Sequence, residues 1–252
     1  MSLPLQDRVN LLQQATADGS PLEHLLLGDR VLTIAANGTG NPGASVTYLV
    51  VLESRRQGIF KPFAGQHPNA CANYQQDPFE AIIHEVAAWR LAHALGAPWD
   101  QLVPTAVLRV LHGAGPGVLI NWRRGSPDPA VFEQANAQVC AAAFWDAVIG
   151  QQDRHATNFR YDAETRRLAL IDNAFAFARP NDLHNQSLFL AYRRSTHMVT
   201  LNGDETTALE TILDSEDLLG LRLFIVEDRA DALEARARDM LERRLLPLPG
   251  DF

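Results

Sequence analysis

The chain has 252 residues, of which 46% are hydrophobic and 21% charged, enough apolar content for a two-lobed domain with real cores and too much for wholesale disorder. Its net charge of −8 argues against nucleic-acid binding and against docking on an anionic membrane by charge alone. No apolar run reaches the roughly 18 residues of a membrane span, and residues 1–4 do not open a signal peptide, so we expect a cytoplasmic protein without a stable membrane anchor.

Helix and strand patterns predict a small β-rich lobe in the first half of the chain. Apolar residues recur at helical spacing over residues 5–17, which favours a peripheral helix. Further along, β-branched and aromatic residues bounded by turn signals predict strands over residues 30–36, 46–54, 58–63, 105–111 and 117–122. About five strands and one major helix therefore make up this lobe.

Glycines are concentrated in the loop between the first two predicted strands. Gly38, Gly40 and Gly43 lie within six residues, followed by Ser45. Glycines allow a backbone to approach a ligand closely, so this loop is a candidate phosphate-binding segment. The alternative is an ordinary flexible hairpin loop, which the loop taken alone would favour.

Lys61 is the single lysine among the 22 lysine and arginine residues of the chain, and it lies in the predicted strand over residues 58–63. An ammonium is a compact point charge suited to a phosphate oxygen in a narrow slot, whereas a guanidinium is a wide planar fork. Arginine-biased codon usage explains why lysines are few, but not why this one stands here. We therefore interpret Lys61 as a phosphate-binding residue, with codon bias as the alternative.

Residues 79–95 carry the clearest helix signals of the chain. Asp77 is a candidate N-cap, Pro78 takes the first helical position, and Gly96 ends the helix. Glu85 lies in the middle of this helix among apolar residues, where capping does not explain it. It either faces solvent or is a buried functional carboxylate.

The second half of the chain is predicted to be mainly helical. Residues 123–129 form a polar linker, after which residues 132–150 read as an apolar helix. Helical periodicity returns over residues 205–213 and 229–246. Glu/Arg pairs four residues apart in the last segment are typical of a stabilised surface helix.

Cys71 and Cys140 are the two cysteines of the chain. They lie far apart and form no C-x-x-C pair. This spacing is typical of reduced thiols in a cytosolic protein rather than of a disulfide framework. We expect both thiols to be buried.

The densest cluster of chemically active residues begins at Asp153. Asn158 follows it five positions later, the D-x-x-x-x-N spacing of a kinase catalytic loop. Apolar runs around a turn signal predict a hairpin over residues 158–172, whose midpoint at residue 165 would place Asn158 opposite Asp172. An amide oxygen and a carboxylate that meet there form a hard-oxygen site for Mg²⁺, with Asp153 within reach of an attacking hydroxyl.

Each of these residues also has a structural alternative. Asp153 could cap the preceding helix, Asn158 could be a turn residue, and His155 could be a satisfied core histidine. Their combination, downstream of Lys61 and Glu85, instead predicts phosphoryl transfer, which needs alignment and neutralisation of phosphate charge rather than covalent help from the protein.

The motif Asp153-Arg154-His155-x-x-Asn158, followed by Ile171-Asp172, resembles the phosphatidylinositol 3-/4-kinase superfamily, most closely type II phosphatidylinositol 4-kinases and their small bacterial relatives. Residues 58–62 with residues 84–88 resemble the same bacterial group. HipA-type serine/threonine kinases share the Asp-Arg-His-x-x-Asn arrangement more distantly. The resemblance covers residues 30–180.

The resemblance implies an α+β, two-lobed atypical protein-kinase-like fold with a small β-rich N-lobe and a helical C-lobe. ATP would bind between the lobes with Mg²⁺ or Mn²⁺. Lys61 would hold the phosphates, and Glu85 would orient it. Asp153, with His155 beside it, would serve the acceptor hydroxyl.

In the same family pattern, Asn158 and Asp172 would bind the metal, and Gly38, Gly40, Gly43 and Ser45 would form the nucleotide loop. The strand over residues 117–122 should run into the hinge, so Asn121 and Trp122 are predicted to contact adenine. The chain would divide into an N-terminal helical extension (1–27), an N-lobe (28–120) and a C-lobe (121–252).

We therefore expect an ATP-dependent kinase whose acceptor is a hydroxyl on a protein or peptide. The segment 174–187 favours this acceptor over a phosphoinositide, because it holds only Arg179 as a firm positive charge; Arg193 and Arg194 lie just beyond it. Ala174 stands where the lipid kinases often have glycine. The alternatives are a lipid or small-molecule kinase and a nucleotide-binding pseudokinase. The sequence carries no signal for an oligomeric state.

Overall fold

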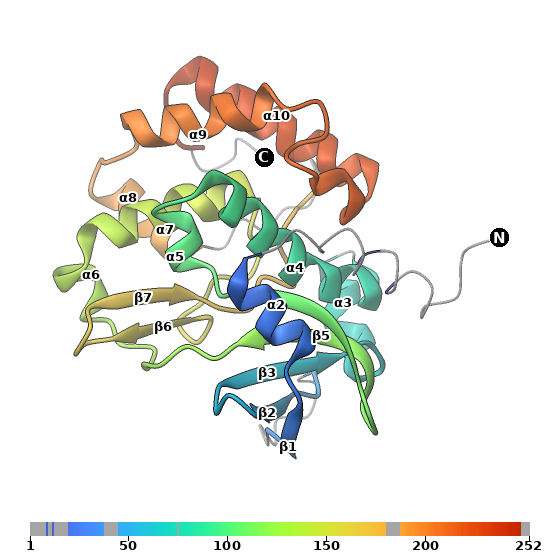
Figure 1. Ribbon diagram of the computed structural model, residues 1–252. Coiled ribbons are helices and arrows are strands. Elements are labelled where there is room, and N and C mark those ends of the chain that lie inside the picture. Colours follow the sequence, from blue (N-terminus) through green and yellow to red (C-terminus); the bar gives the residue numbers. More distant parts are fainter. Residues whose placement is uncertain are drawn as a thin grey trace. The chain divides into compact units, whose positions relative to one another are not determined.

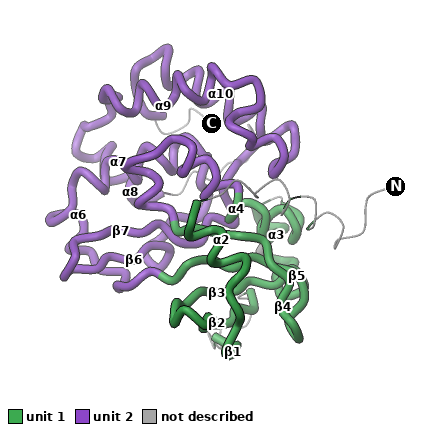
Figure 2. Tube along the Cα trace, in the orientation of Figure 1, with its two compact units in different colours: residues 1–86, 104–122 green, residues 87–103, 123–252 purple. Residues whose placement is uncertain are grey.

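The computed structural model describes Val9, Leu12 and residues 20–37, 45–74, 76–179 and 187–247, drawn in Figure 1. The chain divides into two compact units, coloured separately in Figure 2: residues 1–86 with 104–122, and residues 87–103 with 123–252. The first unit is rich in strands and the second is mainly helical, which confirms the α+β class. The predicted helix over residues 5–17 lies outside the described residues except for Val9 and Leu12, which are both helical.

Within the described residues, five antiparallel strands form the sheet of the first unit and confirm the strand prediction. They are β1 (Val31–Ala36), β2 (Tyr48–Leu52), β3 (Gln57–Pro62), β4 (Ala106–Leu111) and β5 (Gly115–Asn121). Their spatial order is β1-β2-β3-β5-β4, so the later hairpin joins the sheet through β5. Lys61 lies on β3, in the middle of the sheet, opposite Val118 of β5.

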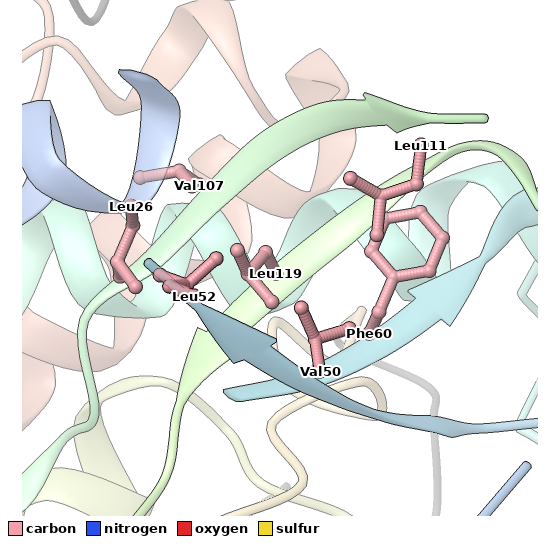
Figure 3. Close-up of a cluster of buried hydrophobic side chains, with 7 residues drawn as sticks. All are labelled: Leu26, Val50, Leu52, Phe60, Val107, Leu111 and Leu119. Atoms are coloured by element: carbon pink, nitrogen blue, oxygen red, sulfur yellow. The ribbon is translucent and has the colours of Figure 1, made fainter. Parts of the chain in front are cut away.

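Helix α2 (Pro21–Gly28) completes the core of the first unit. The buried apolar cluster shown in Figure 3 combines Leu26 of this helix with side chains from the sheet: Val50, Leu52, Phe60, Val107, Leu111 and Leu119. The Arg109 guanidinium of β4 donates hydrogen bonds to the carbonyls of Leu26, at 2.7 Å, and Asp29. Because carbonyls at a helix C-terminus lack intrahelical partners, these bonds tie α2 to the sheet.

Helix α4 (Pro78–Leu95) begins and ends where its capping signals predicted. Asp77 Oδ1 accepts the N–H groups of Phe79, at 2.8 Å, and Glu80, at 3.1 Å. Gly96 follows the last helical residue with a φ of 73°, which glycine adopts without a steric penalty. The shorter η1 (Phe63–Gly65) and α3 (Pro68–Asn73) precede it.

The second unit contains most of the helices of the described chain. They are α5 (Trp99–Leu102), α6 (Val131–Gln134), α7 (Asn136–Val148), α8 (Leu188–Ser195), α9 (Gly203–Leu213), η2 (Leu221–Leu223) and α10 (Glu227–Arg243). The prediction of one helix over residues 132–150 was wrong, because Ala135 leaves helical conformation with a φ of −136° and separates α6 from α7. The Tyr161 hydroxyl donates to Gln134 Oε1 at 3.1 Å, which holds the end of α6 against a distant strand.

A two-stranded hairpin, β6 (Phe159–Asp162) and β7 (Arg167–Leu170), confirms the hairpin prediction. The preceding linker runs beside it, since the Tyr161 N–H donates to the Ser126 carbonyl at 2.8 Å. Gly125 makes this approach possible: its φ is 109°, and a Cβ there would lie 2.4 Å from the Tyr161 carbonyl oxygen.

Helix α10 has one Glu/Arg pair of the predicted kind, Arg238 with Glu234 at 2.8 Å, and an Asp/Arg pair at the same spacing, Arg243 with Asp239 at 3.1 Å. It is not only a surface helix, however. Arg236 is buried and donates to the carbonyls of Val148, at 3.1 Å, and Ala178, at 2.6 Å. The expectation of a surface helix therefore covers only one face of α10, because the Arg236 guanidinium on the other face donates to buried main-chain carbonyls.

Both cysteines are free thiols, as expected. Cys71 is buried, but Cys140 is only half-buried and donates to Asn136 Oδ1 at 3.3 Å, so the prediction of two buried thiols holds for Cys71 alone. Burial raises the pKa of each thiol. Among the described residues, no helix is both long and apolar enough to span a bilayer.

Candidate active site

A buried ion pair joins β3 to α4 in the first unit. The Lys61 ammonium lies 2.6 Å from Glu85 Oε1. Lys61 is 9% exposed and Glu85 only 2%, so the solvent-facing alternative for Glu85 is wrong. Taking two charges out of water is costly, and an apolar pair of similar volume is often no less stable. Stability alone therefore does not account for this pair, whose carboxylate fixes the position of the ammonium.

Gly117 allows the strand beside Lys61 to come close. It lies opposite Pro62 in the β3–β5 register. A Cβ at this position would lie 2.4 Å from the Lys61 carbonyl oxygen and 2.6 Å from the Phe60 ring. Sequence reasoning placed Gly117 at the start of a strand but missed this packing role, because the partner strand was not known.

The predicted contacts between the glycine-rich loop and a nucleotide remain predictions. Gly38, Gly40 and Gly43 lie outside the described residues. The Ser45 hydroxyl donates to Gln66 Oε1 at 3.0 Å.

The predicted adenine contacts at the end of β5 also remain untested. The N–H of Asn121 donates to the Thr105 carbonyl at 2.8 Å, and that of Trp122 to the Gln57 carbonyl at 3.0 Å. Both main-chain donors are thus engaged in the sheet of the first unit. A hydrogen bond from this segment to adenine would have to use other main-chain groups.

In the second unit, a tight loop brings together Asp153, His155 and Asn158. The Asn158 side-chain N–H donates to the Asp153 carbonyl at 2.7 Å, and the Asn158 main-chain N–H donates to the His155 carbonyl at 3.0 Å. Asp153 is not a cap of the preceding helix, because α7 ends at Val148. The sequence spacing therefore placed these residues in one loop correctly.

His155 lies on the surface of this loop, so the core-histidine alternative is wrong. Its side chain is 53% exposed, and its Nε2 lies 3.7 Å from Asp153 Oδ2. The Thr157 main-chain N–H donates to His155 Nδ1 at 3.2 Å. Because Nδ1 accepts this bond, the neutral ring carries its proton on Nε2, the nitrogen that faces Asp153.

Asp172 lies one residue beyond its predicted place in the hairpin. The Ile171 N–H donates to the Asn158 carbonyl at 3.2 Å, so Ile171, not Asp172, stands opposite Asn158. The prediction failed because Asp162 Oδ1 accepts the N–H groups of Glu164 and Thr165 and closes a turn with an even number of residues. Asp172 itself has a φ of 61°, an uncommon conformation for a non-glycine residue that turns the chain out of the strand.

The donor atoms of Asn158 and Asp172 suit a hard divalent cation. Since Asn158 Nδ2 is committed to the Asp153 carbonyl, Oδ1 is the end of that amide that can accept or ligate. In the described part of the chain, no three His, Cys, Asp or Glu side chains gather as a metal site. Mg²⁺ commonly takes one or two protein ligands and completes its shell with phosphates and water. The residues present fit an ion of that kind better than a closed protein cage.

Arg154 fixes the positions of the loop and the hairpin end, a role that the sequence did not reveal. Its guanidinium is fully buried and donates to the Asn158 carbonyl, at 2.8 Å, to the Ile171 carbonyl, and to Asn173 Oδ1, at 2.7 Å. One side chain thus holds the main chain at Asn158 and next to Asp172.

The partner of Arg154 is Asp146 of α7, which is also fully buried, at 3.2 Å. The Ser187 hydroxyl donates to Asp146 Oδ2 at 2.7 Å. Burial raises the pKa of Asp146, while Arg154 and Ser187 act in the opposite direction. The sequence did carry one signal for this pair, because Asp146 is the only charged residue in the apolar run of residues 144–148.

Comparisons with known proteins identify the fold. No protein-family model and no curated protein matches the chain. A crystal structure of the Golgi casein kinase with Mn/ADP bound has a TM-score of 0.57 at 15% identity, covering 88% of this chain and 74% of that chain. A second structure of that kinase gives 0.56 at 14% identity, with the same coverage. The Helicobacter pylori proinflammatory kinase CtkA reaches 0.47 at 11% identity, covering 88% of this chain and 94% of that chain.

Identities this low establish the fold alone. The two Golgi casein kinase structures carry that conclusion, and the sheet-rich and helical units of the chain agree with it. The chain has an α+β, atypical protein-kinase-like fold.

Proposed function

We propose that the chain is an ATP-dependent phosphotransferase that moves the γ-phosphate of ATP to a hydroxyl group on a protein or peptide. The buried Lys61–Glu85 ion pair is the observation that carries this proposal. It places the ammonium of Lys61 in the middle of the sheet of a kinase-like fold, in a buried ion pair whose desolvation cost is not explained by stability alone. The loop of Asp153 and Asn158 and the left-handed Asp172 supply the other groups that such a reaction needs.

Each residue has a distinct task in this reaction. Lys61, oriented by Glu85, binds phosphate oxygens as a point charge. Asp153 takes the proton of the acceptor hydroxyl, whose oxygen attacks the γ-phosphorus, and the bond to the bridging oxygen breaks so that ADP leaves with that electron pair. Asn158 and Asp172 would hold Mg²⁺ or Mn²⁺, which neutralises charge on the phosphates when bound.

The residues also favour a particular branch of the kinase-like folds. The Asp153-Arg154-His155-x-x-Asn158 motif and Ile171-Asp172 support a place near the phosphatidylinositol 3-/4-kinase-like and HipA-like groups. Within this motif, Arg154 and Asn158 are hydrogen-bonded to one another through the Asn158 carbonyl. The residues of the motif thus form one hydrogen-bonded unit in the folded chain.

Nucleotide binding should appear as a metal-dependent gain in thermal stability. A ligand that binds only the folded state at 100 times its Kd stabilises it by about 2.7 kcal/mol. We expect millimolar ATP with MgCl2 or MnCl2 to raise Tm in differential scanning fluorimetry, and ATP with a chelator to raise it much less. A Tm that stays constant with ATP and either metal would contradict the proposal.

Lys61→Arg should lower turnover by about 10²-fold even though it keeps the positive charge. The wide guanidinium does not reproduce the position of an ammonium that lies 2.6 Å from Glu85 in a site only 9% exposed. The matched control is Arg30→Lys, a swap at a side chain that is 70% exposed, which should leave turnover unchanged. Near-normal activity of Lys61→Arg would show that the single lysine reflects codon usage.

A further inference from the structure

A cavity of about 680 Å³ lies beside the catalytic loop, entirely within the second unit. One wall is formed by Pro127, Pro129 and Phe132. His155 of the catalytic loop and Leu188 and Ala191 of α8 form the others. Its volume is within the range of about 300–1,000 Å³ that is usual for ligand pockets.

The walls of this cavity are held by contacts that include the catalytic loop itself. The Leu188 N–H donates to the Arg154 carbonyl at 3.1 Å, which fixes the start of α8 against the loop. The Phe132 ring packs on Tyr192 of α8, with centroids 4.9 Å apart, and on Phe189 at 5.6 Å. These contacts hold α8 against the loop and against Phe132, so the walls of the cavity are packed on one another.

Most of the polar groups in the walls are already committed to the protein. Arg154 is paired with Asp146, the Ser187 hydroxyl donates to the same carboxylate, and the Arg194 guanidinium donates to the Pro247 carbonyl at 2.8 Å. Apart from His155, the rest of the lining consists of prolines, aromatic rings and aliphatic side chains. The lining thus complements an uncharged, apolar group.

The cavity shares one lining residue, His155, with the loop that carries Asp153. His155 is one of its walls, and its Nε2 lies 3.7 Å from Asp153 Oδ2. The cavity thus lies one side chain away from the proposed base, so a group bound in it could bring an attached hydroxyl to Asp153. Orientation of this kind is a large part of the catalysis of group transfer.

We propose that this cavity is the acceptor-specificity pocket of the phosphotransferase, and that it takes a bulky apolar side chain of a peptide adjacent to the serine or threonine that receives the phosphate. The proposal rests on the proposed function. The seryl or threonyl oxygen loses its proton to Asp153 and gains the γ-phosphoryl group, with ADP as the leaving group.

The arginines that the sequence offered for binding a phosphoinositide headgroup are paired within the protein, which favours a peptide acceptor. Arg193 is buried and paired with Glu205 at 3.0 Å, and Arg179 is paired with Asp228 at 2.6 Å. Recognition of an anionic headgroup uses clusters of basic residues, each contributing about 1 kcal/mol near an anionic surface. Arg179 and Arg193, two of the arginines that could have bound a headgroup, thus form ion pairs within the protein.

A degenerate peptide library with a central serine or threonine tests the pocket. With flanking positions fixed one at a time, we expect at least a tenfold preference for Phe, Tyr or Leu over Ala, Asp and Lys at one position. Ala191→Trp, which fills the cavity from an exposed helical position, should erase this preference by raising KM. Ala235→Trp, at an exposed alanine of α10 outside the cavity lining, should retain it.

Hydrolysis of ATP without peptide separates the two proposals, because water replaces the acceptor and the pocket is not used. Ala191→Trp should keep this hydrolysis and Asp172→Asn should lose it. Hydrolysis with no apolar preference, or a preference unchanged in Ala191→Trp, overturns the pocket assignment alone. Transfer to phosphatidylinositol vesicles rather than to peptides also overturns it. Absence of both ATP binding and hydrolysis in the wild type overturns the proposed function itself.

Discussion

Asp172→Asn is expected to lower phosphate transfer by about 10²–10³-fold while Tm without nucleotide stays close to that of the wild type. The substitution keeps the size of the side chain and removes the single charge among the two proposed metal ligands. Asp172 holds the left-handed conformation at φ 61°, which asparagine tolerates well. Initial rates with γ-labelled ATP, together with Tm, measure the effect. The matched control, Asp204→Asn at an exposed position of α9, should change neither.

Lys61→Ala should cause a loss of similar size, but with a cost in stability. It leaves Glu85, which is 2% exposed, buried without its ammonium partner. The double variant Lys61→Met, Glu85→Gln removes both charges together and should recover stability without recovering turnover. Recovery of turnover in the double variant would contradict a catalytic role for Lys61.

The largest loss of stability is expected for Arg154→Met. The substitution leaves Asp146 fully buried without its cationic partner, and it leaves the carbonyls of Asn158 and Ile171 without the guanidinium donor. Removing one partner of a buried ion pair typically costs about 3–5 kcal/mol. Urea unfolding should show this as a lower midpoint with an unchanged slope.

A double-mutant cycle shows how much of that loss belongs to the pair. Asp146→Leu combined with Arg154→Met removes both charges and should be more stable than the sum of the two single changes predicts. Additive losses would contradict the coupling. Turnover of the double variant should stay low, because the main chain at Asn158 and Ile171 still lacks its guanidinium donor.

The elements that the sequence predicted well are those with local signals. The limits of α4 followed from Asp77, Pro78 and Gly96, which act within one turn of the helix ends. The strands of the first unit followed from side-chain patterns. The helix break at Ala135 has no glycine or proline beside it, so no local pattern predicts it. A tertiary hydrogen bond from the Tyr161 hydroxyl to Gln134 holds the break in the folded chain.

Some residues of the candidate site were also predictable from the sequence, and others were not. Lys61 stood out as the single lysine of the chain, and Glu85 stood out as a carboxylate among apolar residues of a helix; the structure pairs the two side chains. The hairpin register was wrong by one residue, since it depends on how Asp162 closes the turn. The Asp146–Arg154 pair was missed because its members belong to different elements and meet only in the folded chain.

The most direct test of phosphotransfer, as opposed to nucleotide binding alone, is a paired measurement on the wild-type protein. Purified chain is incubated with γ-labelled ATP, Mg²⁺ and a mixture of protein and peptide acceptors, and labelled product and released ADP are counted in the same samples. We predict that label accumulates on serine or threonine hydroxyls together with ADP, and that both signals fall at least about 10²-fold in Asp172→Asn. Binding of ATP without release of ADP or transfer of label would contradict the account and identify the chain as a pseudokinase.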